Sequence, residues 1–199
     1  MKIVSLVLFA SVMTALVSFK QAGKTVAPHQ VTYEVDKDVS TLGWKGGTNP
    51  SYFHTGIVKF TSGKAQIEHG TFVNGEFVVD LNSITVNDAG LPKEKQDGLA
   101  KHLKNEDFFN VMKYATAKVT VSSFKDGKFA TTINLLGVDV KQDIPVTVTT
   151  EGSNIIVKGK FDVDFTAANI PGTVKHEGDK ESISPVFTFD LNLVLKAQK

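Results

Sequence analysis

The sequence predicts an all-β protein, an antiparallel β-barrel of about eight strands with one short capping α-helix near residues 93–105. Amphipathic strand patterns run from about residue 31 to residue 196 of the 199-residue chain, and turn-forming dipeptides separate them at short spacing. Several short strands with regular turns are typical of a barrel or a sandwich. A β meander interrupted once by a lid-like helix favours a barrel that encloses something. We therefore expect an apolar ligand to be carried or sequestered, ahead of any catalysis.

The first residues of the chain predict a secretory signal peptide. A positively charged start is followed by an apolar run from Ile3 to Val17 with small residues in its second half, which is the layout of such a peptide. The run is shorter than the ~20 residues of a membrane-spanning helix, although a retained membrane anchor is the alternative. Ser18 and Ala22 are candidate cleavage sites. We expect residues 1–22 to be the signal peptide, residues 28–199 to form a single domain, and the protein to be periplasmic or secreted after bacterial export.

The composition excludes several classes of site. The chain has no cysteine and no arginine, and its 22 basic and 21 acidic residues nearly balance. Without cysteine there are no disulfides, no lipidated cysteine, no thiolate metal ligands and no cysteine nucleophile. Arginine is the usual residue for bidentate recognition of phosphates and bases, so we expect no nucleic-acid partner. An exported protein without disulfides depends on its core for stability, and this chain is long enough to form one.

Glycine-containing dipeptides mark the expected turns between strands. These are Gly46-Gly47 with Asn49-Pro50, Ser62-Gly63, Asn74-Gly75, Asp126-Gly127, Glu151-Gly152 and Pro171-Gly172. Asn74-Gly75 and Asp126-Gly127 are the strongest hairpin signals, because both central residues of a type I′ turn need positive φ.

Alternation between these turns assigns one face of each strand to the interior. Residues 155–165 carry apolar side chains at every second position, with lysines and aspartates between them, and residues 183–195 repeat the pattern. One face of each strand is therefore buried and the other is exposed to solvent, as in antiparallel sheets. The helical stretch begins after Pro92 and presents Leu99 and Leu103 on one side. Because Gly98 weakens it by about 1 kcal/mol relative to alanine, we expect a cap that can move.

Polar residues with catalytic potential are scattered. The histidines are His29, His54, His69, His102 and His176, and no two have the spacing typical of a metal site. His54, at the start of a predicted strand, is a candidate polar group at a barrel mouth, but a histidine satisfied by a backbone carbonyl is the plainer interpretation. Asp80, Ser83 and His102 form a triad only on paper, because Ser83 lies within a strand pattern and not on a nucleophile elbow.

A set of segments along the mature chain carries a family resemblance. They are Tyr33-Glu-Val-Asp36 with Ser40-Thr-Leu-Gly-Trp44, His54-Thr-Gly56 with Val58 and Phe60, Gly75-Glu-Phe-Val-Val-Asp80 with Ser83-Ile-Thr-Val86, His102-Leu-Lys104 with Asp107-Phe-Phe109 and Tyr114, and Ile133-Asn-Leu-Leu-Gly-Val138 before Ile144-Pro-Val146. No single segment is diagnostic, but in this order they resemble the YceI-like family of exported bacterial proteins. That resemblance implies a lipocalin-like barrel that binds polyisoprenoid lipids.

Two positions depart from the family pattern. Where the family usually has Asp-Arg-Thr followed by an aromatic residue, this chain has Asp164-Phe165-Thr166 and then Ala167. If the family arginine anchors a polar head group, this chain lacks that anchor. The second departure, Ala115 in place of a proline after Tyr114, we interpret as structurally minor.

The resemblance implies an apolar tunnel that takes an isoprenoid tail, such as that of a quinone or a polyprenyl-type lipid, as bound ligand with no further cofactor and no catalytic group. From strand alternation and the cap, the predicted lining residues are Trp44, Val58, Phe60, Phe77, Phe108, Phe109, Val146, Val148, Phe161, Val163, Phe165, Phe187, Phe189 and Leu191. Transient membrane contact and a monomer or homodimer are compatible with this function. The alternatives are a packed barrel without ligand, acting as a stress-related or partner-binding envelope protein, and an enzyme that uses His54 on a small apolar substrate.

Overall fold

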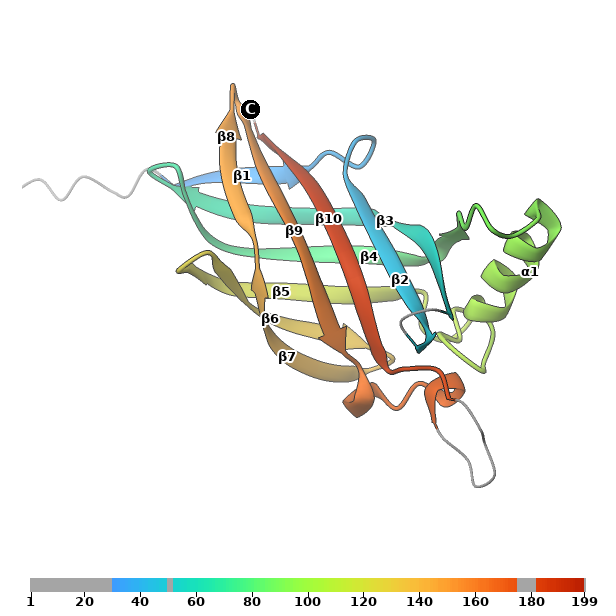
Figure 1. Ribbon diagram of the computed structural model, residues 1–199. Helices are drawn as coiled ribbons and strands as arrows, with labels where there is room; N and C mark the ends of the chain where they lie inside the picture. The colour runs from blue at the N-terminus through green and yellow to red at the C-terminus, as the bar shows by residue number, and fades with distance from the viewer. Residues whose placement is uncertain (1–29, 50–51, 175–181, 199) are drawn as a thin grey trace, which may run out of the picture.

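The computed structural model describes residues 30–49, 52–174 and 182–198, so the predicted signal peptide lies outside the described residues. Within these ranges the chain forms one antiparallel sheet of ten strands, strongly bent around an apolar core, with one α-helix at one end (Figure 1). The strands are β1 (Gln30–Val35), β2 (Thr41–Asn49), β3 (Tyr52–Glu68), β4 (Thr71–Val86), β5 (Thr116–Lys125), β6 (Lys128–Leu135), β7 (Val138–Pro145), β8 (Thr147–Glu151), β9 (Asn154–Asp164) and β10 (Val186–Ala197). The predicted all-β, barrel-like fold with one helix is confirmed.

The ten strands occupy eight positions around the barrel. β1 and β2 share one position in the sheet, since each pairs with β3 on one side and with β10 on the other. β7 and β8 share another position beside β9, although only β8 forms a ladder with it: β8 pairs with the first half of β9, and the Gln142 side chain of β7 donates a hydrogen bond to the Asp162 carbonyl of β9. Counted in this way, the sheet agrees with the expected eight strands.

The β3–β4 hairpin corrects two predicted turns. Ser62-Gly63 lies inside β3 and Asn74-Gly75 lies inside β4, whereas the turn is made by His69 and Gly70, with φ of 49° and 79°. A Cβ at Gly75 would lie 2.9 Å from the Lys64 carbonyl oxygen and about 3 Å from two phenylalanine rings. The glycine therefore permits close packing inside a strand and does not form a turn.

The other turns are a mixture of expected and unexpected positions. Asp126-Gly127 forms the predicted two-residue turn between β5 and β6, with φ of 51° and 73°. The β6–β7 turn is made by Leu136 and Gly137, with φ of 53° and 81°. The sequence did not predict this second turn, because leucine is not a residue that favours a left-handed conformation.

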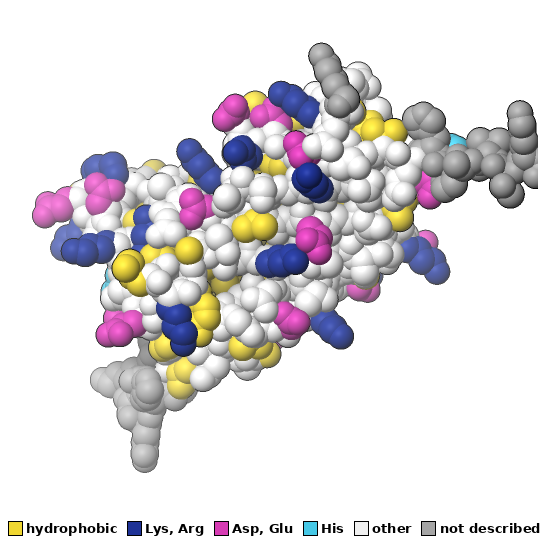
Figure 2. Space-filling model, turned by 180° about the vertical axis from the view of Figure 1, so that it is seen from behind, with side chains coloured by type: hydrophobic (Ala, Val, Ile, Leu, Met, Phe, Trp, Pro, Cys, Tyr) yellow, Lys and Arg dark blue, Asp and Glu magenta, His cyan; other side chains and the backbone are white. Residues whose placement is uncertain are grey.

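The helix α1 (Lys93–Lys104) has the predicted position and begins after Pro92. It buries Ala100 and Leu103 and leaves its lysines outside. The loop before it is tied down by Gln96, whose Nε2 donates to the carbonyl oxygens of Asp88 (2.9 Å) and Leu91 (2.8 Å). Figure 2 shows the charged side chains that surround this end of the barrel. No helix among the described residues is long and apolar enough to cross a bilayer.

The two ends of the barrel are built differently. The hairpin end carries the β3–β4, β5–β6 and β8–β9 turns, and the helix end carries α1, the tip between β2 and β3, and the two short 3-10 helices η1 (Thr166–Ala168) and η2 (Pro171–Thr173) (Figure 1). At the hairpin end Phe72, Ile155 and Leu195 are at most 2% exposed. The Phe129 ring closes this core, with its centroid 4.4 Å from that of Phe72 and 5.4 Å from that of Phe124.

Candidate binding cavity

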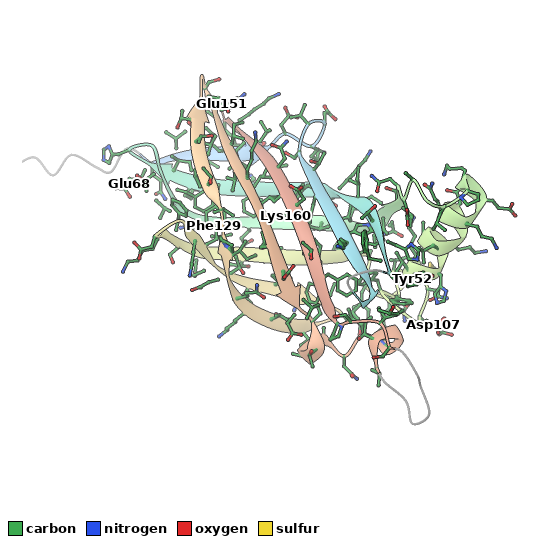
Figure 3. The ribbon with its side chains drawn as sticks, in the orientation of Figure 1. Tyr52, Glu68, Asp107, Phe129, Glu151 and Lys160 are labelled. Carbon is green, nitrogen blue, oxygen red and sulfur yellow. The ribbon has the colours of Figure 1, made fainter. Side chains whose placement is uncertain are left out.

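An apolar cavity of about 140 Å³ occupies the barrel between the helix end and Phe129. Its wall comes from strands on all sides of the barrel and from the segment that follows α1 (Figure 3). The lining residues are Leu42, Trp44, Val58, Phe60, Phe77, Val79, Leu81, Ile84, Leu103, Phe109, Ala117, Val119, Val121, Phe129, Thr131, Ile133, Leu135, Ile144, Phe161, Val163, Phe165, Phe187, Phe189, Leu191 and Leu193. Figure 3 marks the two ends of the barrel, with Tyr52 and Asp107 beside α1 and Glu68 and Glu151 away from it.

The wall of the cavity offers a ligand no hydrogen bond. Thr131 is the one hydroxyl-bearing residue among the described lining residues, and its Oγ1 donates to the Gln142 carbonyl oxygen at 2.6 Å. The indole Nε1 of Trp44 donates to the Thr85 carbonyl oxygen at 3.2 Å. Both polar atoms are therefore already paired with the barrel. A cavity of this kind excludes polar ligand groups, because they would lose their hydrogen bonds to water without replacement.

Eleven of the fourteen residues predicted to line the site lie on the cavity wall. Phe108, Val146 and Val148 do not. Phe108 is buried beside it, with its ring 5.2 Å from the His102 ring, and a Cβ at Gly172 would meet that ring at 2.5 Å. Val146 and Val148 lie at and beyond the β7–β8 break, where the alternation that carries Ile144 inward is interrupted. Whether any lining residue touches a ligand stays a prediction.

The prediction from sequence did not include fourteen further lining residues. Most of them belong to β4, β5 and β6, where inward side chains recur at every second position, for example Ala117, Val119 and Val121. The same period-2 pattern was available in the sequence, so alternation applied to these strands would have found them. Ile84 is different, because the β3–β4 register shifts between Ile57 and Lys59, and this irregularity changes the spacing of inward residues on β4.

Phe165, which the family resemblance places where an arginine is usual, has its side chain turned into the barrel. The residue is 5% exposed, and its ring centroid lies 6.0 Å from that of Phe187 and 6.2 Å from that of Phe189. The flanking residues keep a polar turn on the surface: the Thr166 hydroxyl and amide both donate to the Asp164 carboxylate, and these hydrogen bonds lower the pKa of that carboxyl group. Phe165 therefore adds an aromatic ring to the cavity wall.

Trp44 depends on a glycine in the neighbouring strand. Gly56 pairs directly with Trp44 across β2 and β3. A Cβ at Gly56 would lie 2.6 Å from the indole ring and 1.8 Å from the Thr85 carbonyl oxygen. The missing side chain lets the indole lie against β3 and hydrogen-bond to β4, which forms one wall of the cavity.

The segment after α1 covers the cavity at the helix end. Phe109 lies on the cavity wall with its ring centroid 6.3 Å from that of Phe187. Its amide donates to the Leu103 carbonyl oxygen, and the Gly172 amide of η2 donates to the Asp107 carbonyl oxygen. Helix, segment and η2 are thus linked by backbone hydrogen bonds to form one lid, whose inner surface is Leu103 and Phe109.

The polar candidates at this end have structural partners. His54 Nδ1 lies 2.8 Å from Asp88 Oδ2, so its partner is a carboxylate and not the backbone carbonyl that we expected. Hydrogen bonds from His54 and from the Gly90 amide lower the pKa of Asp88. Ser83 Oγ donates to the Asp80 carbonyl oxygen and accepts from the Lys59 amide, which stabilises the irregular β3–β4 register. No group of three or more histidine and acidic side chains in the described part of the chain could hold a metal ion.

Comparison with known proteins supports the same architecture. The sequence model of the YceI-like domain family matches residues 33–195. The chain resembles the structure of a polyisoprenoid binding domain from Saccharophagus degradans implicated in plant cell wall breakdown, with a TM-score of 0.60 and 18% identity over 84% of this chain and 99% of that one. It also resembles Burkholderia cenocepacia BcnA, with a TM-score of 0.63 and 17% identity over 80% and 98% of the two chains. Among curated proteins no sequence matches at a significant level.

Proposed function

Because this chain belongs to the YceI-like domain family, we propose that it is an exported binding protein that holds the isoprenoid tail of a quinone or polyprenyl-type lipid in its barrel, for transport, storage or sequestration. The observation that carries the proposal is the cavity wall, in which all side chains but that of Thr131 are apolar. Such a wall recognises apolar surface and no other chemistry. A binding role needs no catalytic step, and the paired polar groups at the helix end are consistent with that.

The energetics favour a tail over a head group. Burial of one methylene contributes roughly 0.8 kcal/mol, so each five-carbon isoprene unit offers about 4 kcal/mol before the costs of association. A 150 Å³ cavity lined by aliphatic and aromatic side chains accommodates a benzene-sized molecule. The present volume of about 140 Å³ therefore suits about one isoprene unit, and a longer tail requires the phenylalanine side chains on the wall to rotate.

Phenylalanines make such an expansion feasible. Phe161, Phe189 and Leu191 face inward from β9 and β10 but are only partly buried, in contrast to Val163 and Leu193 on the same strands. The rings of Phe161 and Phe189 are tilted relative to each other, with 6.1 Å between their centroids. Side chains with free volume beside them change rotamer at lower cost than those in a close-packed core.

The first test is mass spectrometry of the organic-solvent extract of the protein, purified from its own host without detergent. We expect an isoprenoid lipid at a stoichiometric amount. A protein that is empty and also fails to take up added quinone contradicts the proposal.

A matched pair of variants tests whether the extracted lipid is bound in the cavity. Phe161→Asp introduces a charge on the wall, whereas Lys160→Asp introduces the same side chain one residue away on the wet face of β9. We expect the first to lose the lipid and the second to keep it, with both folded by circular dichroism. Normal lipid content in Phe161→Asp would mean that the ligand lies elsewhere.

The small cavity volume also favours a second candidate, a packed barrel that acts as a stress-related or partner-binding envelope protein. In that case the rings at Phe165, Phe187 and Phe189 are core residues that keep the interior closed. This candidate predicts no lipid in the extract and no uptake of a fluorescent apolar probe. Phe165→Ala then has no effect on uptake, whereas in a ligand-binding barrel it enlarges the cavity and increases uptake.

A further inference from the structure

Exposed hydrophobic side chains gather at the helix end of the barrel. Among the described residues, the large hydrophobic side chains that are exposed are Val39, Tyr52, Phe53, Met112, Val174 and Val186. All but Val39 belong to segments of the helix end: the start of β3, the segment after α1, the end of η2 and the start of β10. Met112 is 95% exposed. Single exposed hydrophobic residues are ordinary, but a concentration of them at one end is not.

Backbone hydrogen bonds link neighbouring segments at this end of the barrel. The Gly172 amide donates to the Asp107 carbonyl oxygen, which links η2 to the segment after α1, and the Ser184 amide donates to the Gly47 carbonyl oxygen, which links the start of β10 to β2. Val186 precedes Phe187, and Met112 is three residues after Phe109; both phenylalanines lie on the cavity wall. We call Phe53, Met112, Val174 and Val186 the apolar rim.

Lysines accompany the apolar rim. Lys113 is next to Met112, Lys45 Nζ lies 3.6 Å from the centroid of the Phe53 ring, and Lys101 is exposed on α1. A shallow groove between α1 and β4 is lined by the apolar residues Ile84 and Val86, by Lys93, Lys101 and Lys104, and by Asp97. Figure 2 shows hydrophobic side chains at this end of the molecule, with both lysines and acidic side chains beside them. Apolar side chains flanked by lysines are the pattern of a surface that inserts into a lipid interface, where the ammonium groups meet anionic head groups.

We propose that the apolar rim and its lysines dock on an anionic lipid surface, so that the ligand passes between the bilayer and the cavity without crossing water. The inference rests on the proposed function, because a carrier of a water-insoluble tail must collect it from a lipid phase. The lid formed by α1, Phe109 and η2 lies within the docked surface, and its opening therefore faces the bilayer. Acidic side chains such as Glu94, Asp97 and Glu106 also lie at this end, so the proposal assigns the contact with anionic head groups to the exposed lysines Lys101 and Lys113 and not to the charge of the whole end.

The test is co-sedimentation of the protein with vesicles of mixed phosphatidylglycerol and phosphatidylcholine, with pure phosphatidylcholine vesicles as the comparison. We expect binding to the anionic vesicles that weakens as salt is added. Met112→Glu should lower the partition coefficient about tenfold, through lost apolar burial and added repulsion. Val39→Glu is the matched control, since Val39 is 50% exposed but lies in the β1–β2 loop. Every variant carries the same N-terminus, so its contribution to vesicle binding cancels.

A pair of charge-matched variants tests the lysines. Lys101→Glu/Lys113→Glu changes the helix end, and Lys125→Glu/Lys128→Glu changes the charge equally at the hairpin end, where both lysines are exposed. We expect the first pair to lose about fivefold in vesicle binding per lysine and the second pair to bind like the wild-type protein.

Uptake of a water-soluble short-chain quinone separates docking from ligand binding. The Met112 and lysine variants should take up this probe normally, whereas Phe161→Asp should lose the probe and still bind vesicles. If the wild-type protein takes up the probe but ignores anionic vesicles, or if Val39→Glu weakens vesicle binding as much as Met112→Glu, the docking proposal is wrong. A dimer in size-exclusion chromatography that Met112→Glu dissociates, without vesicle binding, would show that a second copy covers the rim and would also overturn it.

Discussion

The hairpin end and the middle of this barrel are lined by the same kinds of residue but are packed in opposite ways. At the hairpin end Phe72, Ile155, Val157 and Leu195 are at most 2% exposed, and Phe129 seals the layer. In the middle of the barrel Phe161, Phe189 and Leu191 face the same interior yet are only partly buried, because they line the cavity. The difference teaches that hydrophobicity alone does not decide between a core and a binding site. What differs is whether facing side chains meet.

The largest expected contrast comes from removal of one ring in each of these two regions. Phe72→Ala should lower the free energy of unfolding by about 3–5 kcal/mol, because it leaves a void in a close-packed layer. Phe189→Ala should lower it by about 1–2 kcal/mol, because part of the ring already faces empty space. Urea unfolding of the two variants measures both values. Equal losses would mean that the middle of the barrel is packed as tightly as the hairpin end.

Substitutions that add volume should also affect the two regions differently. Val157→Phe, at a position with 0% exposure, should cost about 1–3 kcal/mol or more through overpacking. Val119→Phe points into the cavity and should change the unfolding free energy by less than about 1 kcal/mol while it reduces uptake of an apolar probe. A strong destabilisation by Val119→Phe would show that the cavity cannot accept even one additional ring.

A glycine pair sharpens the comparison within the helix end. Gly56→Ala should destabilise by about 1–3 kcal/mol, because its Cβ would collide with the Thr85 carbonyl oxygen and the Trp44 indole. Gly98→Ala on α1, where a Cβ meets nothing within 4 Å, should stabilise by about 1 kcal/mol. Thermal unfolding gives both values. A neutral Gly56→Ala would mean that Trp44 can leave its hydrogen bond with Thr85 without cost.

The smallest expected effect is the acid sensitivity of the lid. The hydrogen bond from His54 holds the pKa of Asp88 below its ordinary value of 3.8. A lowered folded-state pKa means that the stabilisation is present above pH 3.8 and is lost as the pH falls through the lower folded-state value. Asp88→Asn should therefore remove a small part of the acid dependence of amide exchange in α1. Asp36→Asn is the control, since its carboxylate, paired with Lys196, also has a lowered pKa but lies outside the lid. Identical acid dependence in the wild-type protein and Asp88→Asn would contradict this assignment.

The limits of prediction can be traced to particular residues. The inward positions of β9 and β10, such as Phe161, Val163 and Phe187, followed from alternation because side-chain direction in a strand is a local property. The turn predicted at Asn74-Gly75 was wrong, because sequence alone does not distinguish a glycine that permits close packing inside a strand from a glycine that forms a turn. Val146 and Val148 pack in the core but do not line the cavity, because the break between β7 and β8 interrupts the alternation at these residues. Ser83 and His54 acquired their roles only from partners far away in the sequence.

The sequence by itself determined the strand faces, the helix and the family, because period-2 patterns, capping residues and ordered motifs are encoded locally. Only the tertiary structure decided that the same apolar faces close into a sealed layer around Phe129 and leave a cavity toward α1. It also decided that Phe165 turns inward to meet Phe187 and Phe189. Both outcomes depend on how far apart facing strands lie, and that distance is set by the register and curvature of the whole sheet.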